Sequence, residues 1–278
     1  MSDTTPANSG RLLVNASWLH EHPDQPGLVV VDVRPPHAYQ AGHIPGAVNL
    51  DLYAIRAQSS EPEDVDVFDR EVERRFRDIG VDNDSDVIFC EDISGPTAAR
   101  AVWLMEYLGH DRTAVLDGGI HAWVKAGYDL TMAVPDVERG DFTIEPRPQR
   151  LASAGYIRDH LNDTEVAIWD TRNVSEYTGA NVLAGRGGTI PGAVHLEWIE
   201  NMNPDGTLKE PEALRAQLTA KGLTPDKEII PFCQSGFRSA HGYLVARLLG
   251  YPRVRNYVTS WSEWGNRPDL PIEQPRSQ

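Results

Sequence analysis

Cysteine is scarce in this chain, which contains only Cys90 and Cys233 among its 278 residues. Two cysteines are too few for a disulfide framework, and no Cys-x-x-Cys pair is present, so we expect reduced thiols. Long apolar runs are also absent, because none approaches the roughly 18 residues that a membrane-spanning helix needs. The opening stretch MSDTTPANSG is polar and lacks the apolar core of a signal peptide. We therefore expect a cytoplasmic protein.

The chain also has fewer positively charged than negatively charged residues. Lysine and arginine number 26 against 41 aspartates and glutamates, which gives a formal net charge of −15. A charge of this sign argues against nucleic acids and anionic membranes as partners. If the substrate is an anion, its site must create a local positive potential against this field. The nine histidines show no metal-ligand spacing, so we expect no metal site.

The two halves of the chain resemble each other. Four landmarks recur in the same order, namely VVVDVR and AIWDTR, GHIPGAVNL and GTIPGAVHL, VIFCEDISG and IIPFCQSGF, and YLGH and LLGY. The offsets between copies run from 138 (29 to 167) to 146 (42 to 188), which is too long a period for a solenoid. We predict two tandem homologous domains, residues 1–134 and 151–278, joined by a proline-dotted linker at 135–150.

Each half alternates strand-like with helix-like segments. Apolar, β-branched runs predict buried strands at residues 28–33, 86–90, 113–119, 165–170, 228–232 and 254–258. Helical patterns follow at residues 66–80, 94–109, 120–127, 210–222 and 237–250, with Ser94 as an expected N-cap. This alternation predicts an α/β fold in which each domain is a mostly parallel sheet flanked by helices.

Cys233 lies between a predicted strand, EIIPF, and a predicted helix that begins near Phe237. Parallel α/β sheets place their sites at this edge, where the strands end. The loop QSGF contains small residues, so its backbone can curl and point its N–H groups inward. These dipoles, the helix N-terminus and the guanidinium of Arg238 all favour negative charge. We therefore expect the thiol pKa to fall below about 8.5 and to leave a thiolate nucleophile at neutral pH.

The spacing from Cys233 to Arg238 is Cys-x4-Arg. Tyrosine-phosphatase loops read Cys-x5-Arg, where the additional residue widens the ring of amides around a tetrahedral phosphate. Position 239 is Ser, so the wider pattern fails by one residue. A tighter ring suits a small charged group, such as a sulfur atom attached to the cysteine. A phosphatase is thus the weaker alternative, and the intact Cys233 and Arg238 argue against a non-catalytic binding module.

The chain as a whole resembles the tandem-domain rhodaneses of bacterial type. The resemblance rests on the DVR…GHIPGAV and DTR…GTIPGAV motifs, on a six-residue loop that opens with Cys only in the second half, and on the closing SWSEWGNRPDLPI. It implies a thiosulfate:cyanide sulfurtransferase with a silent first domain, in which Glu91 or Asp92 takes the position of Cys233. It also implies ping-pong transfer through a Cys233 persulfide that loop amides stabilise, without a metal or an organic cofactor.

The candidate donor-binding residues are those of the loop and one arginine outside it: Gln234, Ser235, Gly236, Phe237, Arg238, Ser239 and Arg186. We expect Arg238 and Arg186 to hold the sulfonate end of the donor. The expected partners are a small-molecule sulfur donor and a thiophilic acceptor, which is cyanide or a thiol, with a thiol-bearing protein as a further candidate.

Departures from the family leave the donor open. Animal thiosulfate enzymes carry basic residues directly after the cysteine, whereas this chain has the neutral Gln234 and Ser235. They also carry an arginine at the position of Glu176. Mercaptopyruvate-using relatives begin the loop Cys-Gly-Ser-Gly, whereas this chain reads Cys-Gln-Ser-Gly. The pattern Cys-Gln-x-x-x-Arg-Ser is similar to that of bacterial enzymes that accept thiosulfate. It favours thiosulfate over 3-mercaptopyruvate.

Other notable residues have structural explanations. Cys90 lies in or at the end of a strand without a basic neighbour, so we expect an inert buried thiol. The pair Asp32 and Arg34 recurs as Asp170 and Arg172, and thus occurs in the silent half too. That symmetry favours an ion pair that ties the end of a strand to a loop over a role in the site.

Overall fold

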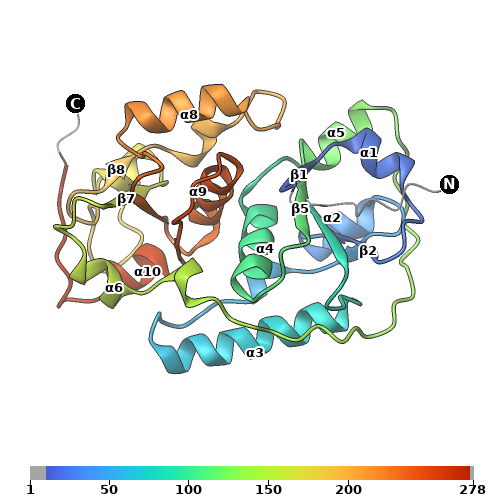
Figure 1. Ribbon diagram of the computed structural model, residues 1–278, viewed down its shortest axis with the longest axis horizontal. Helices are drawn as coiled ribbons and strands as arrows, with labels where there is room; N and C mark the ends of the chain where they lie inside the picture. The colour runs from blue at the N-terminus through green and yellow to red at the C-terminus, as the bar shows by residue number, and fades with distance from the viewer. Residues whose placement is uncertain (1–10, 276–278) are drawn as a thin grey trace. The chain divides into compact units, whose positions relative to one another are not determined.

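Short parallel strands alternate with helices along the computed structural model of this protein, which describes residues 11–275. The chain divides into two units, each with a sheet of its own (Figure 1). The first unit contains residues up to Ile55, Phe68–Pro146 and Asn203–Leu208, and the second contains Arg56–Val67, Arg147–Met202 and residues from Lys209 onward. The main boundary, at Pro146, falls within the stretch that we expected to be a linker.

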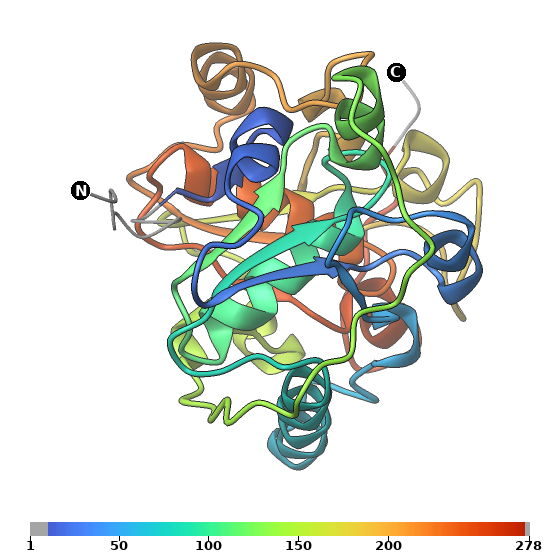
Figure 2. The same cartoon turned by 90° about the vertical axis from the view of Figure 1, so that its right-hand side faces the viewer.

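The first unit is built on a five-stranded sheet in the order β1-β5-β4-β2-β3, and every pairing in it is parallel. Figure 2 shows its longer strands side by side. The elements of this half of the chain are β1 (Leu13–Val14), α1 (Ala16–Glu21), β2 (Leu28–Asp32), α2 (Pro36–Ala41), β3 (Val48–Asn49), the 3-10 helix η1 (Leu52–Ala54), α3 (Pro62–Asp78), β4 (Asp86–Cys90), α4 (Pro96–Tyr107), β5 (Thr113–Leu116) and α5 (Gly119–Lys125).

Helices cover both faces of this sheet because its central strands are apolar on both sides. On one face, Ile88 and Cys90 of β4 pack into a core with Leu19 of α1 and Trp123 of α5. On the other face, the Phe89 ring lies 6.1 Å from the Phe76 ring of α3. Cys90 is fully buried, and burial is the main cause that raises its thiol pKa well above the usual value. The expectation of an inert thiol agrees with this setting.

The second unit has a three-stranded parallel sheet, β8-β7-β9, and a two-stranded parallel pair, β10-β6. The elements of this half are the 3-10 helix η2 (Pro148–Arg150), β6 (Leu151–Ala152), α6 (Ala154–Asp159), β7 (Val166–Asp170), α7 (Val174–Tyr177), β8 (Val194–His195), the 3-10 helix η3 (Trp198–Asn201), α8 (Pro211–Ala220), β9 (Glu228–Phe232), α9 (Phe237–Leu248), β10 (Asn256–Tyr257) and α10 (Ser260–Trp264). The prediction of an α/β fold with parallel sheets flanked by helices is confirmed.

Two layers of helices enclose the second sheet, and one of them carries the loop that follows β9. Ile168 and Ile230 pack on the side of α6 and α10, together with Trp261 and Trp264. On the opposite side, a Cβ atom at Gly242 of α9 would lie 3.2 Å from the Trp169 ring. This close approach of helix to strand fixes α9 over the end of β9.

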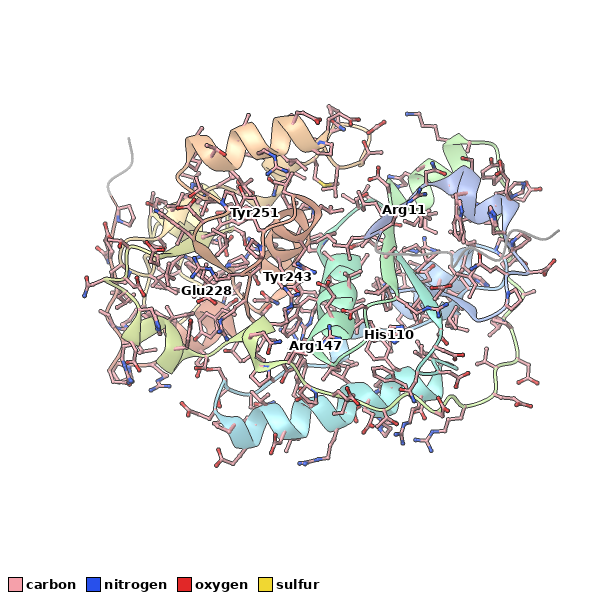
Figure 3. All side chains as sticks on the ribbon, in the orientation of Figure 1. Arg11, His110, Arg147, Glu228, Tyr243 and Tyr251 are labelled. Carbon is pink, nitrogen blue, oxygen red and sulfur yellow. The ribbon has the colours of Figure 1, made fainter. Side chains whose placement is uncertain are left out.

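Strand β9 is anchored at its beginning by a buried carboxylate. Glu228 accepts a hydrogen bond from Arg255 at 2.8 Å and another from the Tyr156 hydroxyl (Glu228 is labelled in Figure 3). The Arg255 guanidinium also lies 4.4 Å from the centre of the Tyr156 ring. The strand that ends next to Cys233 is therefore fixed at its opposite end by a paired charge.

Two local features differ from the sequence expectations or add to them. Helix α4 is capped by Gly95 and not by Ser94, whose hydroxyl instead donates to Asp117 at 2.6 Å and accepts from the Gly118 N–H. The segment 254–258 pairs with β6 through only two residues, Asn256 and Tyr257. Within residues 11–275, no helix combines the length and apolar character needed to cross a membrane.

Candidate active site

Cys233 follows β9 directly, and α9 begins four residues later at Phe237. Gly236 caps this helix with a φ of +84°, a left-handed conformation that glycine adopts at little cost. A Cβ atom at Gly236 would lie only 2.2 Å from the carbonyl oxygen of Val258. The loop therefore turns sharply against a neighbouring segment, and only glycine fits at the turn.

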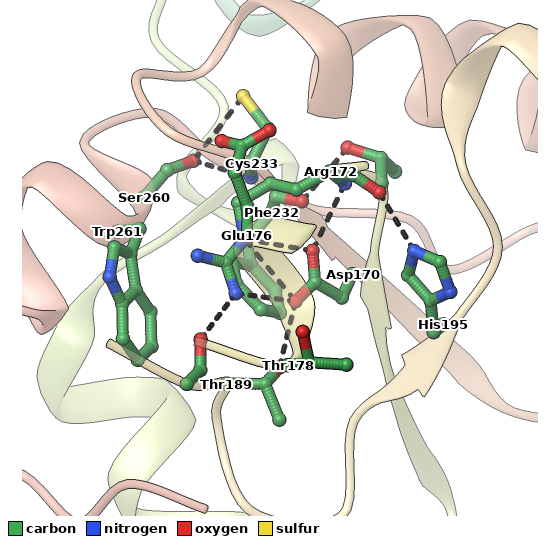
Figure 4. Close-up of polar contacts among 12 residues, drawn as sticks. Asp170, Arg172, Glu176, Thr178, Thr189, His195, Phe232, Cys233, Ser260 and Trp261 are labelled. Carbon is green, nitrogen blue, oxygen red and sulfur yellow. Dashed lines mark hydrogen bonds and ion pairs between the residues drawn. The ribbon is translucent and has the colours of Figure 1, made fainter. Parts of the chain in front are cut away.

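Helix α10 holds the loop from the other side. The carbonyl groups of Cys233 and Gln234 accept hydrogen bonds from the N–H groups of Trp261 and Ser262, at 3.0 and 2.8 Å. The Cys233 N–H donates to the Ser260 hydroxyl at 3.0 Å (Figure 4). That hydroxyl donates in turn to the carbonyl of Tyr257. The backbone of the nucleophile candidate is thus fully engaged.

Ser260 is a site residue that the sequence analysis missed. It has a φ of +51° and is the one non-glycine residue with positive φ in the described part of the chain. The equivalent residue of the first unit is Gly119, with a φ of +55°. A serine in this conformation costs free energy that glycine avoids, so the side chain is retained for its contacts. The sequence does contain a signal for Ser260: Ser260-Trp261 in the second half aligns with Gly119-Ile120 in the first.

The thiol of Cys233 is buried, with a residue exposure of 1%, and lies among hydrogen-bond donors. Its Sγ accepts from the Gly236 N–H at 3.2 Å. Burial, the largest influence, raises the pKa of Cys233, but the charge of Arg238 and the N–H groups of Ser239 and Ser235 outweigh it and lower the pKa below its usual value. These contacts shift the equilibrium of Cys233 toward the thiolate.

Arg238 is paired with a carboxylate from another element. Its two terminal nitrogens donate to the two oxygens of Glu176 on α7, at 2.6 and 2.8 Å. Although burial raises the pKa of Glu176, its bonds with Arg238 lower it overall, so the carboxylate is ionised. Arg238 also interacts electrostatically with Cys233. The Arg238 guanidinium thus interacts with both Cys233 and the Glu176 carboxylate.

The Asp-x-Arg motifs form the ion pairs that their symmetry predicted. Arg172 donates to Asp170 at 2.6 Å and to the carbonyl of Gly188 at 2.7 Å. Arg34 makes the same bonds with Asp32 and the carbonyl of Gly42, at the same two distances. These ion pairs tie strand end to loop in both units. In the second unit the Arg172 guanidinium additionally lies 4.5 Å from the centre of the Trp261 ring.

Arg186 is engaged away from the loop that we expected it to assist. Its guanidinium donates to the carbonyls of Trp264 and Leu270, both at 2.9 Å, and also to those of Gly265 and Arg267. Four carbonyls therefore occupy the group that we expected to bind the donor. The arrangement gives Arg186 the task of fixing the glycine-rich loop to the C-terminal segment, and it leaves Arg238 as the sulfonate ligand to test.

The first unit has an equivalent loop in which Glu91 takes the place of Cys233. The carbonyl of Glu91 accepts from the Ile120 N–H as that of Cys233 accepts from Trp261, which decides between Glu91 and Asp92. One carboxylate oxygen of Glu91 accepts from the N–H groups of Thr97 and Ala98, at 2.7 and 2.8 Å. Burial raises the pKa of this carboxyl to about 7 even though the two N–H groups lower it.

Sequence comparison agrees with this geometry. A family model described as Rhodanese-like domain matches residues 15–126 and again residues 153–267. The thiosulfate sulfurtransferase of Pseudomonas aeruginosa is 36% identical over 264 residues, which cover 94% of this chain and 97% of the relative. A sulfur carrier protein of Thermus thermophilus is 34% identical (94% and 96% covered), and the 3-mercaptopyruvate sulfurtransferase of Escherichia coli is 30% identical (94% and 97% covered).

Solved structures share the fold. The anaerobic ergothioneine biosynthesis enzyme from Chlorobium limicola, in complex with trimethyl histidine, has a TM-score of 0.82 and 24% identity, with 96% of this chain and 71% of that chain covered. A structure of EanB whose cysteine carries a persulfide gives a TM-score of 0.84, with the same identity and coverage. At this identity the likeness concerns the fold alone.

Proposed function

This chain belongs to the rhodanese family of sulfurtransferases, and from that premise we propose that it moves sulfane sulfur from thiosulfate, through a Cys233 persulfide, to a thiophilic acceptor. The observation that carries the proposal is the setting of the thiol. Against the effect of burial, Arg238 and the loop amides lower the pKa of Cys233. A thiolate held in this way is the nucleophile that sulfur transfer requires. In this proposal residues 151–278 form the catalytic domain, residues 135–150 the linker and residues 1–134 a silent domain.

In the first step the Cys233 thiolate attacks the outer sulfur of thiosulfate. A new S–S bond forms as the S–S bond of thiosulfate breaks, and sulfite leaves with the bonding electron pair. The terminal sulfur of the resulting persulfide is anionic, and the amides of residues 234–239 stabilise it as an oxyanion hole stabilises oxygen. The hydroxyl of Ser239 is buried beside the thiol, and its hydrogen bond is one of the contacts that lower the pKa of Cys233, so it is placed to stabilise the sulfur.

In the second step a thiophile attacks the terminal sulfur. The persulfide S–S bond breaks, its electron pair returns to Sγ of Cys233, and the acceptor leaves as thiocyanate or as a new persulfide. Charge and electrons balance in both steps without an oxidant or a reductant. The sulfur carrier protein among the relatives supports a thiol-bearing protein as an additional acceptor.

Thiosulfate is preferred over 3-mercaptopyruvate as the donor for two reasons. The loop begins Cys233-Gln234-Ser235, which differs from the Cys-Gly-Ser-Gly of mercaptopyruvate-using relatives. The identity to a thiosulfate sulfurtransferase, 36%, also exceeds the 30% to a 3-mercaptopyruvate sulfurtransferase. Rates measured with each donor and one acceptor decide between the two.

The proposal is tested by intact mass spectrometry of the full chain, with and without thiosulfate. We expect one added sulfur atom, which cyanide removes with release of thiocyanate. Cys233→Ser is expected to abolish both the adduct and the turnover while leaving the protein folded. Cys90→Ser is the matched control and keeps both, because Cys90 is buried in the core of the first unit. Equal loss in the two variants, or an unmodified thiol with every donor, would overturn the proposal.

A further inference from the structure

The carboxylate of Glu176 engages the terminal nitrogens of Arg238, which is the candidate ligand of an anionic donor. Both terminal nitrogens of Arg238 donate to it, in the two-pronged geometry by which arginine recognises a carboxylate or a sulfonate. Glu176 is itself buried, with an exposure of 2%, and its position is fixed because it forms a capping box with Asn173 at the start of α7. The acid is therefore rigidly placed and cannot swing into solvent without breaking the cap.

The arginine that follows β7 and the arginine of the loop are each paired with an acid. Arg172 and Asp170 neutralise each other, and so do Arg238 and Glu176. When Cys233 is ionised, it and these four side chains carry a net negative charge before any donor arrives, and the loop amides and helix α9 already stabilise that charge. Thiosulfate adds two further negative charges, and like charges brought together in a partly dry site repel strongly.

The fold does not require an acid at this position. Glu176 stands four residues after Arg172, and the matching residue four after Arg34 in the silent unit is Ala38. Helix α2 forms there without a carboxylate, since its first residue is Pro36 and no side chain caps it. The acid is thus present in the unit that carries the thiolate and missing from the unit that does not.

We propose that Glu176 is a specificity-determining residue that sets the preference of the site by the charge of the sulfur donor. Among donors that carry sulfane sulfur, it penalises dianionic thiosulfate and favours those with a single negative charge, such as organic thiosulfonates and persulfides. Glu176 acts on the donor through Arg238 and through its own charge. The proposal rests on the sulfurtransferase function, and it predicts that thiosulfate is accepted with a high KM.

The test compares two donors that differ in charge at the same reacting group. Thiosulfate is a dianion, and methanethiosulfonate replaces one of its oxyanions with a methyl group. In Glu176→Gln we expect kcat/KM for thiosulfate to rise about tenfold, mainly through KM, because a like charge has been removed. For methanethiosulfonate we expect a change of less than about threefold. Glu176→Asp keeps the charge and is expected to retain the wild-type ratio of the two donors.

A second readout separates this proposal from the sulfurtransferase function. Iodoacetate and iodoacetamide alkylate a thiolate and differ in one negative charge. Glu176→Gln is expected to raise the rate ratio of iodoacetate to iodoacetamide at Cys233, whether or not any sulfur donor reacts. Glu200→Gln is the control, because Glu200 also closes a capping box but is exposed. If Glu176→Gln changes neither the rate ratio of the two sulfur donors nor that of the two alkylating reagents, the charge-selecting role of Glu176 is overturned. If no donor adds sulfur to Cys233, only the proposed sulfurtransferase function is overturned.

Discussion

The Glu91 loop of the first unit leads to a prediction about stability that does not depend on catalysis. Glu91 places a carboxyl group among the N–H groups at the start of α4, where the second unit has the thiol of Cys233 at the start of α9. Burial raises the pKa of this carboxyl from its usual 4.5 to about 7. The folded protein therefore prefers the protonated acid over an interval of pH in which the unfolded chain is ionised.

The sign and size of the effect follow from linkage. Between pH 4.5 and pH 7 the native state binds one proton more than the unfolded state at this residue, so stability falls as pH rises through that interval. Each pH unit corresponds to about 1.4 kcal/mol for a fully shifted group, which gives at most about 3 kcal/mol across the interval. Glu91→Gln keeps an oxygen that can accept from Thr97 and Ala98 and removes the titration.

We expect Glu91→Gln to match the wild type near pH 4.5 and to exceed its stability by up to about 3 kcal/mol at pH 8. Hydrogen exchange of the α4 amides reports the first unit separately and is the preferred measurement. Glu138→Gln, an exposed residue of the same unit, is the matched control and should leave the pH dependence unchanged. A stability difference between Glu91→Gln and wild type that is constant from pH 4.5 to 8 would refute the reasoning.

Two further predictions concern the loop of the second unit. Arg238→Gln is expected to raise the pKa of Cys233, because it removes a positive charge that stabilises the thiolate. The pH midpoint of iodoacetamide alkylation should therefore move upward, and an unchanged midpoint contradicts the role of Arg238. Gly236→Ala is expected to lower the free energy of unfolding by about 2 kcal/mol or more in denaturant titration, because φ is +84° and the new Cβ meets the carbonyl of Val258. Alkylation of Cys233 should also be slower in this variant. Wild-type stability of Gly236→Ala contradicts the requirement for glycine.

The parts of the fold that the sequence predicted are those with a strong local pattern. The central strands β2, β4, β7 and β9 are unbroken apolar runs, and their observed bounds lie within one residue of the predicted ones. The short strands β1, β3, β6 and β8 have two residues each, too few to show any period, and none was predicted. Their pairing is fixed by the neighbouring strand and the chain connection, which no local window contains.

The same distinction holds for the site. Cys233 and Arg238 are close in sequence, so the strand-loop-helix pattern was enough to propose them together. Ser260 and Glu176 reach the loop from other elements, 27 residues after Cys233 and 62 before Arg238. Arg186 was proposed from its glycine-rich surroundings, but carbonyls of the C-terminal segment bind its guanidinium. Such partners follow from tertiary packing, which sequence spacing does not encode.

The loops that begin at Glu91 and at Cys233 also differ in length, and this difference separates the two repeats further than the change of residue does. Five residues separate Glu91 from Thr97, which is the second residue of α4, whereas four separate Cys233 from Arg238, the second residue of α9. For the first repeat to perform the chemistry proposed for the second, it would thus need a cysteine, an arginine and a loop shorter by one residue. A cysteine in place of Glu91 would on its own leave a loop one residue longer than the loop that holds Cys233.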